Sequence, residues 1–222
     1  MPTLTQTGIA TKVRQGEKLG TTLPRAFNGN YPNVIVISGT FGAGKSTITR
    51  ELARRYDIPN VVEIVTITRT LRTYFPNSKL LQNWNHFSLG NKKEIIQQLY
   101  TQAQVITCVI NKITELAIRK QEGTIITGVN ILAEYLDLKN ILYCALEVSD
   151  KIAHEYRFLH PFTKLRHFSN PDFTTVNILE REIIRDARKY KLPVIDNSGT
   201  IAETIHQIQQ ICDKAVGVDK VA

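Results

Sequence analysis

One nine-residue segment concentrates the groups that could do chemistry: Gly-Thr-Phe-Gly-Ala-Gly-Lys-Ser-Thr, residues 39–47. It satisfies the pattern G-x-x-x-x-G-K-[ST]. Glycines allow the backbone to turn its N–H groups toward a phosphate, and the helix N-terminus that follows adds a positive dipole end. The spacing therefore predicts a nucleoside triphosphate site formed by Gly39, Phe41, Gly42, Ala43, Gly44, Lys45, Ser46 and Thr47.

The polar side chains of this loop have separate expected tasks. Lys45 would neutralise the β- and γ-phosphates, the Ser46 hydroxyl would bind Mg²⁺, and Thr47 would lie on the α-phosphate side. The expected cofactors are therefore ATP and Mg²⁺. The N-K-x-D motif by which GTPases bind guanine is absent, and 222 residues are few for a large ATPase machine. These features favour a small-molecule kinase.

The elements that must position the loop alternate between two patterns. The buried, β-branched run Val34–Ser38 predicts a strand before the loop, and an amphipathic helix follows it. Alternation along the rest of the chain predicts a three-layer α/β fold with a parallel sheet. The expected strands are 60–68, 124–130, 141–148 and 192–197, and the expected helices are 92–121, 150–158, 174–190 and 201–216.

The domain organisation follows from the same reading. Residues 1–30 are polar with scattered glycines and predict an N-terminal arm, whereas 31–222 would form one kinase-like domain. A segment with two prolines and basic and aromatic residues, 159–173, predicts a lid between two helices.

Several segments together resemble the archaeal 2-phosphoglycerate kinase family of P-loop kinases. They are the phosphate loop with its helix, D-I-P-N-V-V at 57–62, ITRTLRTYF at 67–75, GVNIL at 128–132, HEYRF at 154–158 and KLPVIDN at 191–197. The resemblance implies ATP-dependent phosphorylation of a small anionic hydroxyl compound similar to 2-phosphoglycerate. It also implies roles for polar side chains outside the loop: Arg157 and Arg166 in transfer, Arg69, Arg72 and Asn130 in substrate binding, and Asn197 beside the adenine.

The chain departs from the family pattern at several positions, and two of these departures remove acids. Val65 and Thr127 stand where the family carries acids near the metal and the acceptor. Glu63 would share a strand face with Val65 and could supply a carboxylate. Asp150 and Asp196 are other candidate acids, although a helix cap or a turn is the expected role of each. The missing acids leave open a nucleotide-binding regulatory protein with little or no catalysis.

Composition and charge bear on whether the chain binds nucleic acid, a membrane or a second copy of itself. The net charge of +8 and the aromatic residues Trp84, His86 and Phe87 leave open a nucleoside or polynucleotide kinase. Basic residues are spread along the chain, however, which favours a solvated surface over a nucleic-acid partner. No apolar run approaches about 18 residues, so no membrane partner is expected, and the cytoplasm is the expected location. A homo-oligomer is compatible with the sequence. Three scattered cysteines are expected to be buried, reduced thiols.

Overall fold

The computed structural model describes residues 33–78, 81, 90–160 and 172–216. The expected N-terminal arm, Arg166, the aromatic residues 84–87 and most of the expected lid lie outside the described residues.

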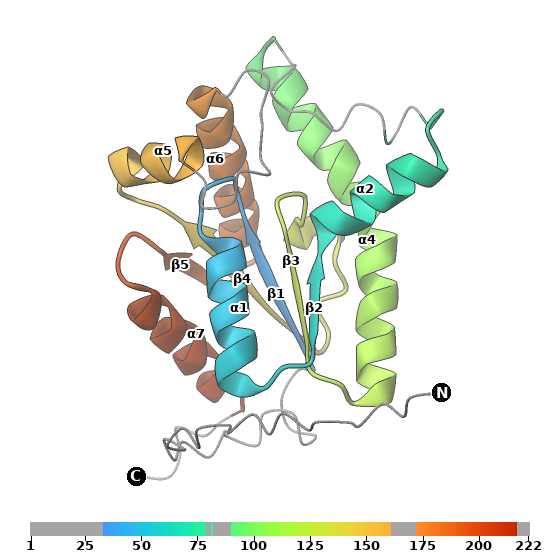
Figure 1. Cartoon of the computed structure of the whole chain (residues 1–222), viewed down its shortest axis with the longest axis vertical. Coiled ribbons are helices and arrows are strands. Elements are labelled where there is room, and N and C mark those ends of the chain that lie inside the picture. The colour runs from blue at the N-terminus through green and yellow to red at the C-terminus, as the bar shows by residue number, and fades with distance from the viewer. Residues whose placement is uncertain (1–32, 79–80, 82–89, 161–171, 217–222) are drawn as a thin grey trace, which may run out of the picture.

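Five parallel strands form the central sheet, in the order β2-β3-β1-β4-β5 (Figure 1). The strands are β1 (Val34–Gly39), β2 (Asn60–Glu63), β3 (Thr124–Gly128), β4 (Ile141–Glu147) and β5 (Val194–Asp196). The parallel α/β fold predicted from the alternation is therefore confirmed. Because all five strands run the same way, their carboxyl ends meet at one edge, where ligands of such sheets bind.

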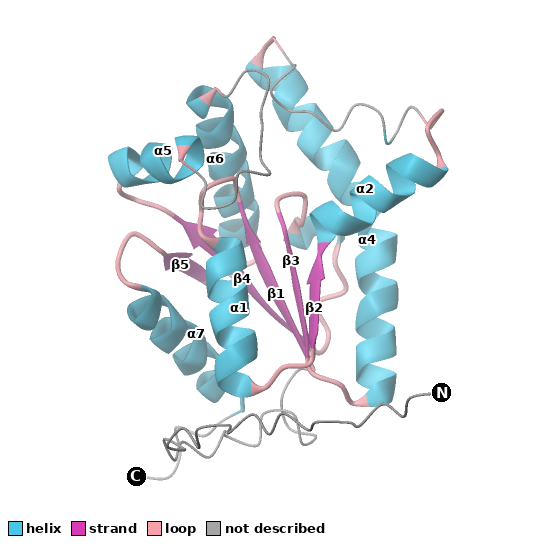
Figure 2. Cartoon of the chain, in the orientation of Figure 1, coloured by secondary structure: helices cyan, strands magenta, loops and turns pink. Residues whose placement is uncertain are grey.

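Helices cover both faces of this sheet (Figure 2). Helices α1 (Lys45–Tyr56) and α7 (Ile201–Val216) pack together over one face, and α4 (Lys92–Lys120) and α6 (Phe173–Lys189) over the other. Alternate residues of β1 divide between the two cores: Val34 and Val36 face α4 and α6, whereas Ile35 and Ile37 face α1. This alternation is the period of a strand that is buried on both faces.

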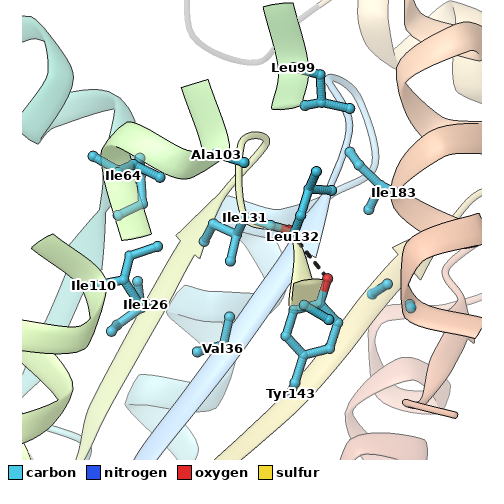
Figure 3. Packing of buried hydrophobic residues seen from close by; sticks show 14 of the residues in the cluster. Val36, Ile64, Leu99, Ala103, Ile110, Ile126, Ile131, Leu132, Tyr143 and Ile183 are labelled. Atoms are coloured by element: carbon cyan, nitrogen blue, oxygen red, sulfur yellow. Dashed lines mark hydrogen bonds between the residues drawn. The ribbon is translucent and has the colours of Figure 1, made fainter. Parts of the chain in front are cut away.

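Buried apolar side chains fill the core beneath the carboxyl edge (Figure 3), and two hydrogen bonds also stabilise it. The Ile131 carbonyl, just beyond β3, accepts the Ser38 hydroxyl at 2.7 Å and the Tyr143 hydroxyl at 3.3 Å. Three neighbouring strands thereby fix one another near the end of β1. Since buried polar groups without partners are costly, this arrangement holds the edge in a single geometry.

The second strand is shorter than predicted. We expected a strand over 60–68, but β2 ends at Glu63 and helix α2 spans Ile64–Tyr74. Ile64 and Thr68 are the buried residues of α2, and their spacing of four is that of one helix face. Tertiary packing thus overrides the β-preference of the Ile-Val-Thr-Ile-Thr run, because Ile64 packs closely against Gly128.

Helix α5 spans Lys151–Leu159 and follows β4. Its first turn is capped by Asp150, whose carboxylate accepts from the N–H groups of Ile152 and Ala153 at 3.1 and 3.0 Å. The expected cap at Asp150 is therefore present, and it sets the start of the helix that carries His154 and Arg157.

The expectation of three buried thiols is correct for only one of them. Cys144 is buried and Cys212 half-buried, whereas Cys108 is exposed on α4. Burial raises the pKa of both the Cys144 and Cys212 thiols to about 12. Within the described ranges, no helix combines the length and apolarity that a membrane crossing requires.

Candidate phosphate-binding site

The loop between β1 and α1 turns through two glycines with left-handed backbone angles. Gly42 has φ 75° and Gly44 has φ 84°, and Gly44 is the residue that caps the N-terminus of α1. A Cβ atom on Gly44 would lie 2.2 Å from Nδ2 of Asn197. Only glycine meets both the conformation and the space at this position.

Two carbonyls of the loop accept hydrogen bonds from side chains that lie outside the loop. The Phe41 carbonyl accepts a hydrogen bond from Nε2 of His154 at 2.8 Å, and the Ala43 carbonyl accepts one from Nδ2 of Asn197 at 2.9 Å. These donors come from different elements, since His154 lies on α5 and Asn197 follows β5. The loop is therefore held at two points that are two residues apart.

The polar side chains that close the loop lie at the start of α1. The Lys45 ammonium donates to the Thr40 carbonyl at 2.6 Å, within the loop itself. Ser46 is half-buried and Thr47 exposed in the first helical turn. The predicted loop residues thus form one continuous structure at the end of β1, with a cation and two hydroxyls at the positive end of a helix.

His154 has no exposed surface and lies between the loop and α6. Its Nδ1 atom is 3.4 Å from Oε1 of Glu180, and its ring meets the edge of the Phe173 ring at 5.2 Å between centroids. Burial lowers the pKa of His154, although the Phe41 carbonyl and Glu180 oppose that shift. Because a carbonyl can only accept, the neutral ring carries its proton on Nε2.

Glu180 is itself engaged by the start of α5. Its carboxylate accepts from the Val148 N–H at 3.0 Å and pairs with the Lys151 ammonium, which also donates to the Val148 carbonyl at 2.7 Å. The carboxylate is almost fully buried, so these partners offset its desolvation. Glu180 is therefore fixed beside Nδ1 of His154, a buried atom that makes no hydrogen bond within the described part of the chain.

Arg157 lies one turn from His154 and contacts the segment that follows β5. Its guanidinium donates to the carbonyl of Asn197 at 2.7 Å and, less closely, to that of Ser198 at 3.4 Å. The Asn197 amide is also committed, because its Oδ1 accepts from the Thr204 hydroxyl at 2.7 Å. The expected sites at Arg157 and Asn197 are thus brought together beside the loop.

Asp196 joins the ends of β4 and β5. It accepts from the Ser149 hydroxyl at 2.5 Å and from the Ser198 hydroxyl at 2.6 Å. Burial alone would raise the pKa of Asp196, but these hydrogen bonds hold it below its ordinary value. The carboxylate therefore has the turn role expected from the sequence.

The positions that lack acids lie at the ends of β2 and β3. Thr127 is buried and donates its hydroxyl to the Ile37 carbonyl at 3.1 Å, while Val65 is exposed in the first turn of α2. Glu63 is the last residue of β2 and pairs in register with Thr127. The expectation that Glu63 shares a strand face with Val65 is wrong, because Val65 is helical. Glu63 is instead the carboxylate at the end of this strand.

The two arginines expected to bind substrate share a pocket on α2. The pocket has a volume of about 400 Å³, and its described lining consists of Arg69, Arg72, Thr73, Phe75 and Pro76. A paired guanidinium surface of this kind suits a carboxylate or phosphate. Asn130, the third expected substrate residue, is buried in the turn after β3.

Part of this arrangement was not apparent from the sequence. His154 appeared in the sequence analysis only as part of the HEYRF segment, so its contact with the loop was not predicted, and Thr204 was not singled out. The spacing His154–Arg157 on one helix was the available signal for a shared neighbourhood. In the described part of the chain, no group of three or more His, Cys, Asp or Glu side chains is placed to hold a metal ion.

Comparison with known proteins bears on the whole arrangement. No protein-family model matches the chain. A solved gluconokinase from Sinorhizobium meliloti superposes with a TM-score of 0.50 at 14% sequence identity, covering 84% of this chain and 95% of that one. At this identity the likeness supports the fold alone.

Curated relatives add a family name. The 2-phosphoglycerate kinase of Pyrococcus horikoshii is 28% identical over 208 residues, covering 85% of this chain and 67% of the relative. Those of Methanocaldococcus jannaschii and Methanopyrus kandleri are 23% and 25% identical, and the chain spans only 64% and 59% of their lengths. The matches confirm the predicted resemblance of this chain to the archaeal 2-phosphoglycerate kinases, as a divergent relative.

Proposed function

We propose that this protein is an ATP-dependent phosphotransferase that acts on a small anionic hydroxyl compound similar to 2-phosphoglycerate. The observation that carries the proposal is the loop at 39–47, with its left-handed glycines, fastened carbonyls and Lys45 at the start of α1. The relatives named above are kinases of this substrate class, which supports the same reaction here. Its use of ATP and a small acid fits the expected cytoplasmic location.

The loop supplies what phosphoryl transfer chiefly requires, which is positioning and positive charge. Backbone N–H groups, the helix dipole and the Lys45 ammonium would surround the β- and γ-phosphates. A phosphate in the loop would draw the ammonium from the Thr40 carbonyl, which it contacts at 2.6 Å. Fixed donors of this kind need little reorganisation when charge develops during transfer.

Mg²⁺ would be held by the Ser46 hydroxyl, and we propose Glu63 as the acid that accompanies it. Glu63 ends β2 beside Thr127, and among the described residues its carboxylate has no hydrogen-bond or ion-pair partner. It lies on the same sheet face as Thr127 and Ile37, which is the face covered by α1. When bound, the metal neutralises phosphate charge. The residues that are present fit a metal held by the Ser46 hydroxyl and water molecules, with the Glu63 carboxylate adding negative charge on the same sheet face.

The acceptor would be held through its own negative charge. Arg69 and Arg72 line one pocket on α2, which begins where β2 ends at the same sheet edge as the loop. Asn130 would contribute from the end of β3. Arg157 would act beside the nucleotide, because it contacts the Asn197 backbone next to the loop. Arg166 is assigned to transfer by the family resemblance.

A second function is favoured by one observation. Thr127 replaces an acid and is committed to the Ile37 carbonyl, so the end of β3 offers the metal no carboxylate. A nucleotide-binding regulatory protein with little turnover would tolerate this change. The loss of a general base typically lowers a rate by about 10²–10⁴-fold.

Transfer of label from γ-labelled ATP separates the two functions. We expect labelled product with 2-phosphoglycerate or a related phosphorylated hydroxy acid, and none with nucleosides or oligonucleotides. The Arg69→Ala/Arg72→Ala double variant should bind ATP with unchanged affinity but show a higher KM for the acceptor. If ATP binds and no acceptor on the panel receives label, the regulatory function replaces the kinase.

A further inference from the structure

The outward carbonyls of the phosphate loop determine where its donors point. In a trans peptide, the C=O of one residue and the N–H of the next point in opposite directions. The hydrogen bond from His154 to the Phe41 carbonyl therefore fixes the direction of the Gly42 N–H. In the same way, the bond from Asn197 to the Ala43 carbonyl fixes the Gly44 N–H.

We propose that His154 and Asn197 are positioning residues that hold the Gly42 and Gly44 N–H groups in the phosphate-binding orientation. This inference rests on the proposed nucleotide site and adds the side chains that set its geometry before a ligand arrives. Neither side chain needs to touch the nucleotide to do so.

The side chains of His154 and Asn197 are both held rigidly, as a positioning role requires. His154 has no exposed surface and is confined by Glu180, by Phe173 and by contact with the loop at Gly42, where a Cβ would lie 3.2 Å from its ring. Asn197 is 6% exposed, and its amide oxygen is held by Thr204. A confined side chain loses little further entropy when the loop binds.

Helix α5 contacts both anchoring points of the loop, directly through His154 and indirectly through Asn197. It carries His154, which bonds to the loop directly, and Arg157, which donates to the Asn197 carbonyl at 2.7 Å. The charged groups around His154 are Glu180 on α6, Lys151 on α5 itself and Lys45 on α1. A shift of α5 would therefore reach both anchored carbonyls at once.

The test uses conservative and non-conservative substitutions in the full chain. His154→Gln retains an N–H donor near the Phe41 carbonyl, whereas His154→Leu removes it. Asn197→Ala removes the second donor. We expect the affinity for inorganic pyrophosphate and for ATP to fall roughly tenfold in His154→Leu and Asn197→Ala, and His154→Gln to recover most of that loss. Ile184→Ala on α6 serves as a control for general loss of core packing.

A second readout needs no ligand. In amide NMR spectra of the free protein, His154→Leu should shift the Gly42 N–H signal most and Asn197→Ala the Gly44 signal. If the wild type binds neither ATP nor pyrophosphate, the proposed function fails, while these amide shifts still decide the positioning role. If the wild type binds both and His154→Leu and Asn197→Ala bind as tightly, with unmoved glycine amides, the inference is overturned.

Discussion

Replacing Gly44 by alanine tests how closely the loop is built around Asn197. At φ 84° a residue with a side chain costs about 1–2 kcal/mol relative to an ordinary conformation. The added Cβ would also lie 2.2 Å from Nδ2 of Asn197, so the amide must move away. That movement leaves the buried Ala43 carbonyl without its donor, which costs about 1–3 kcal/mol. We expect a loss of about 2–5 kcal/mol in the free energy of unfolding.

The assay is urea unfolding, followed by circular dichroism, with ATP binding measured by calorimetry on the same samples. Gly90→Ala is the matched control, because among the described residues, its chain neighbours aside, no atom lies within 4 Å of a Cβ at that position. Its effect should stay within about 0.5 kcal/mol. Gly44→Ala should also abolish measurable ATP binding under conditions where it remains folded.

A double variant separates the clash from the backbone cost. In an Asn197→Ala background no amide opposes the new Cβ, so Gly44→Ala should cost only about 1–2 kcal/mol there. An equal cost of Gly44→Ala in both backgrounds would refute the contact between loop and amide. So would a total cost as small as that of Gly90→Ala.

Three further predictions concern other side chains. Burial lowers the folded-state pKa of His154 below 6.5, so protonation of His154 favours the unfolded chain. The stability that neutral His154 contributes is therefore present above pH 6.5 and lost as the pH falls below that value. Urea midpoints measured at pH 5–8 should show this loss of stability, and His154→Gln should make the loss smaller. Cys108 is exposed and should react with Ellman's reagent in the folded protein, whereas the buried Cys144 thiol, with its pKa near 12, should react only after unfolding; a Cys108→Ser variant that still reacts rapidly would contradict this. Glu63→Gln should weaken the Mg²⁺ dependence of ATP binding, and adding Thr127→Asp should restore it by placing a carboxylate on the neighbouring strand. If Glu63→Gln has no effect on this dependence, Glu63 is not the acid of the metal site.

The parts of the fold that follow from local chemistry were predictable from the sequence. The glycine spacing and the apolar run before it located the loop. Apolar residues that recur every three or four positions predicted α4, with its C-terminal end correct to within one residue. The start of α2 was not predictable in this way. Ile64 and Thr68 are β-branched residues in a β-branched run, and only their packing, with Ile64 against Gly128, makes that segment helical.

The candidate site shows the same division. Lys45 and Ser46 belong to a contiguous motif, so their neighbourhood could be read directly. The contacts of His154 with Phe41 and of Asn197 with Ala43 span 113 and 154 residues, and no local pattern encodes such a pairing. These contacts depend on how α5 and β5 pack beside the loop, which is a property of the complete sheet.

The nucleotide site itself is tested most directly by calorimetric titration of ATP with Mg²⁺ into the wild type and Lys45→Ala. Lys139→Ala, a change at an exposed lysine, is the control for altered net charge. Loss of charge-assisted hydrogen bonds to the phosphates should weaken binding by about 10–100-fold in Lys45→Ala and leave Lys139→Ala unchanged. One ATP bound per chain by the wild type, with that loss, is the predicted result. Equal affinity in the wild type and Lys45→Ala would contradict the assignment of residues 39–47 as the phosphate site.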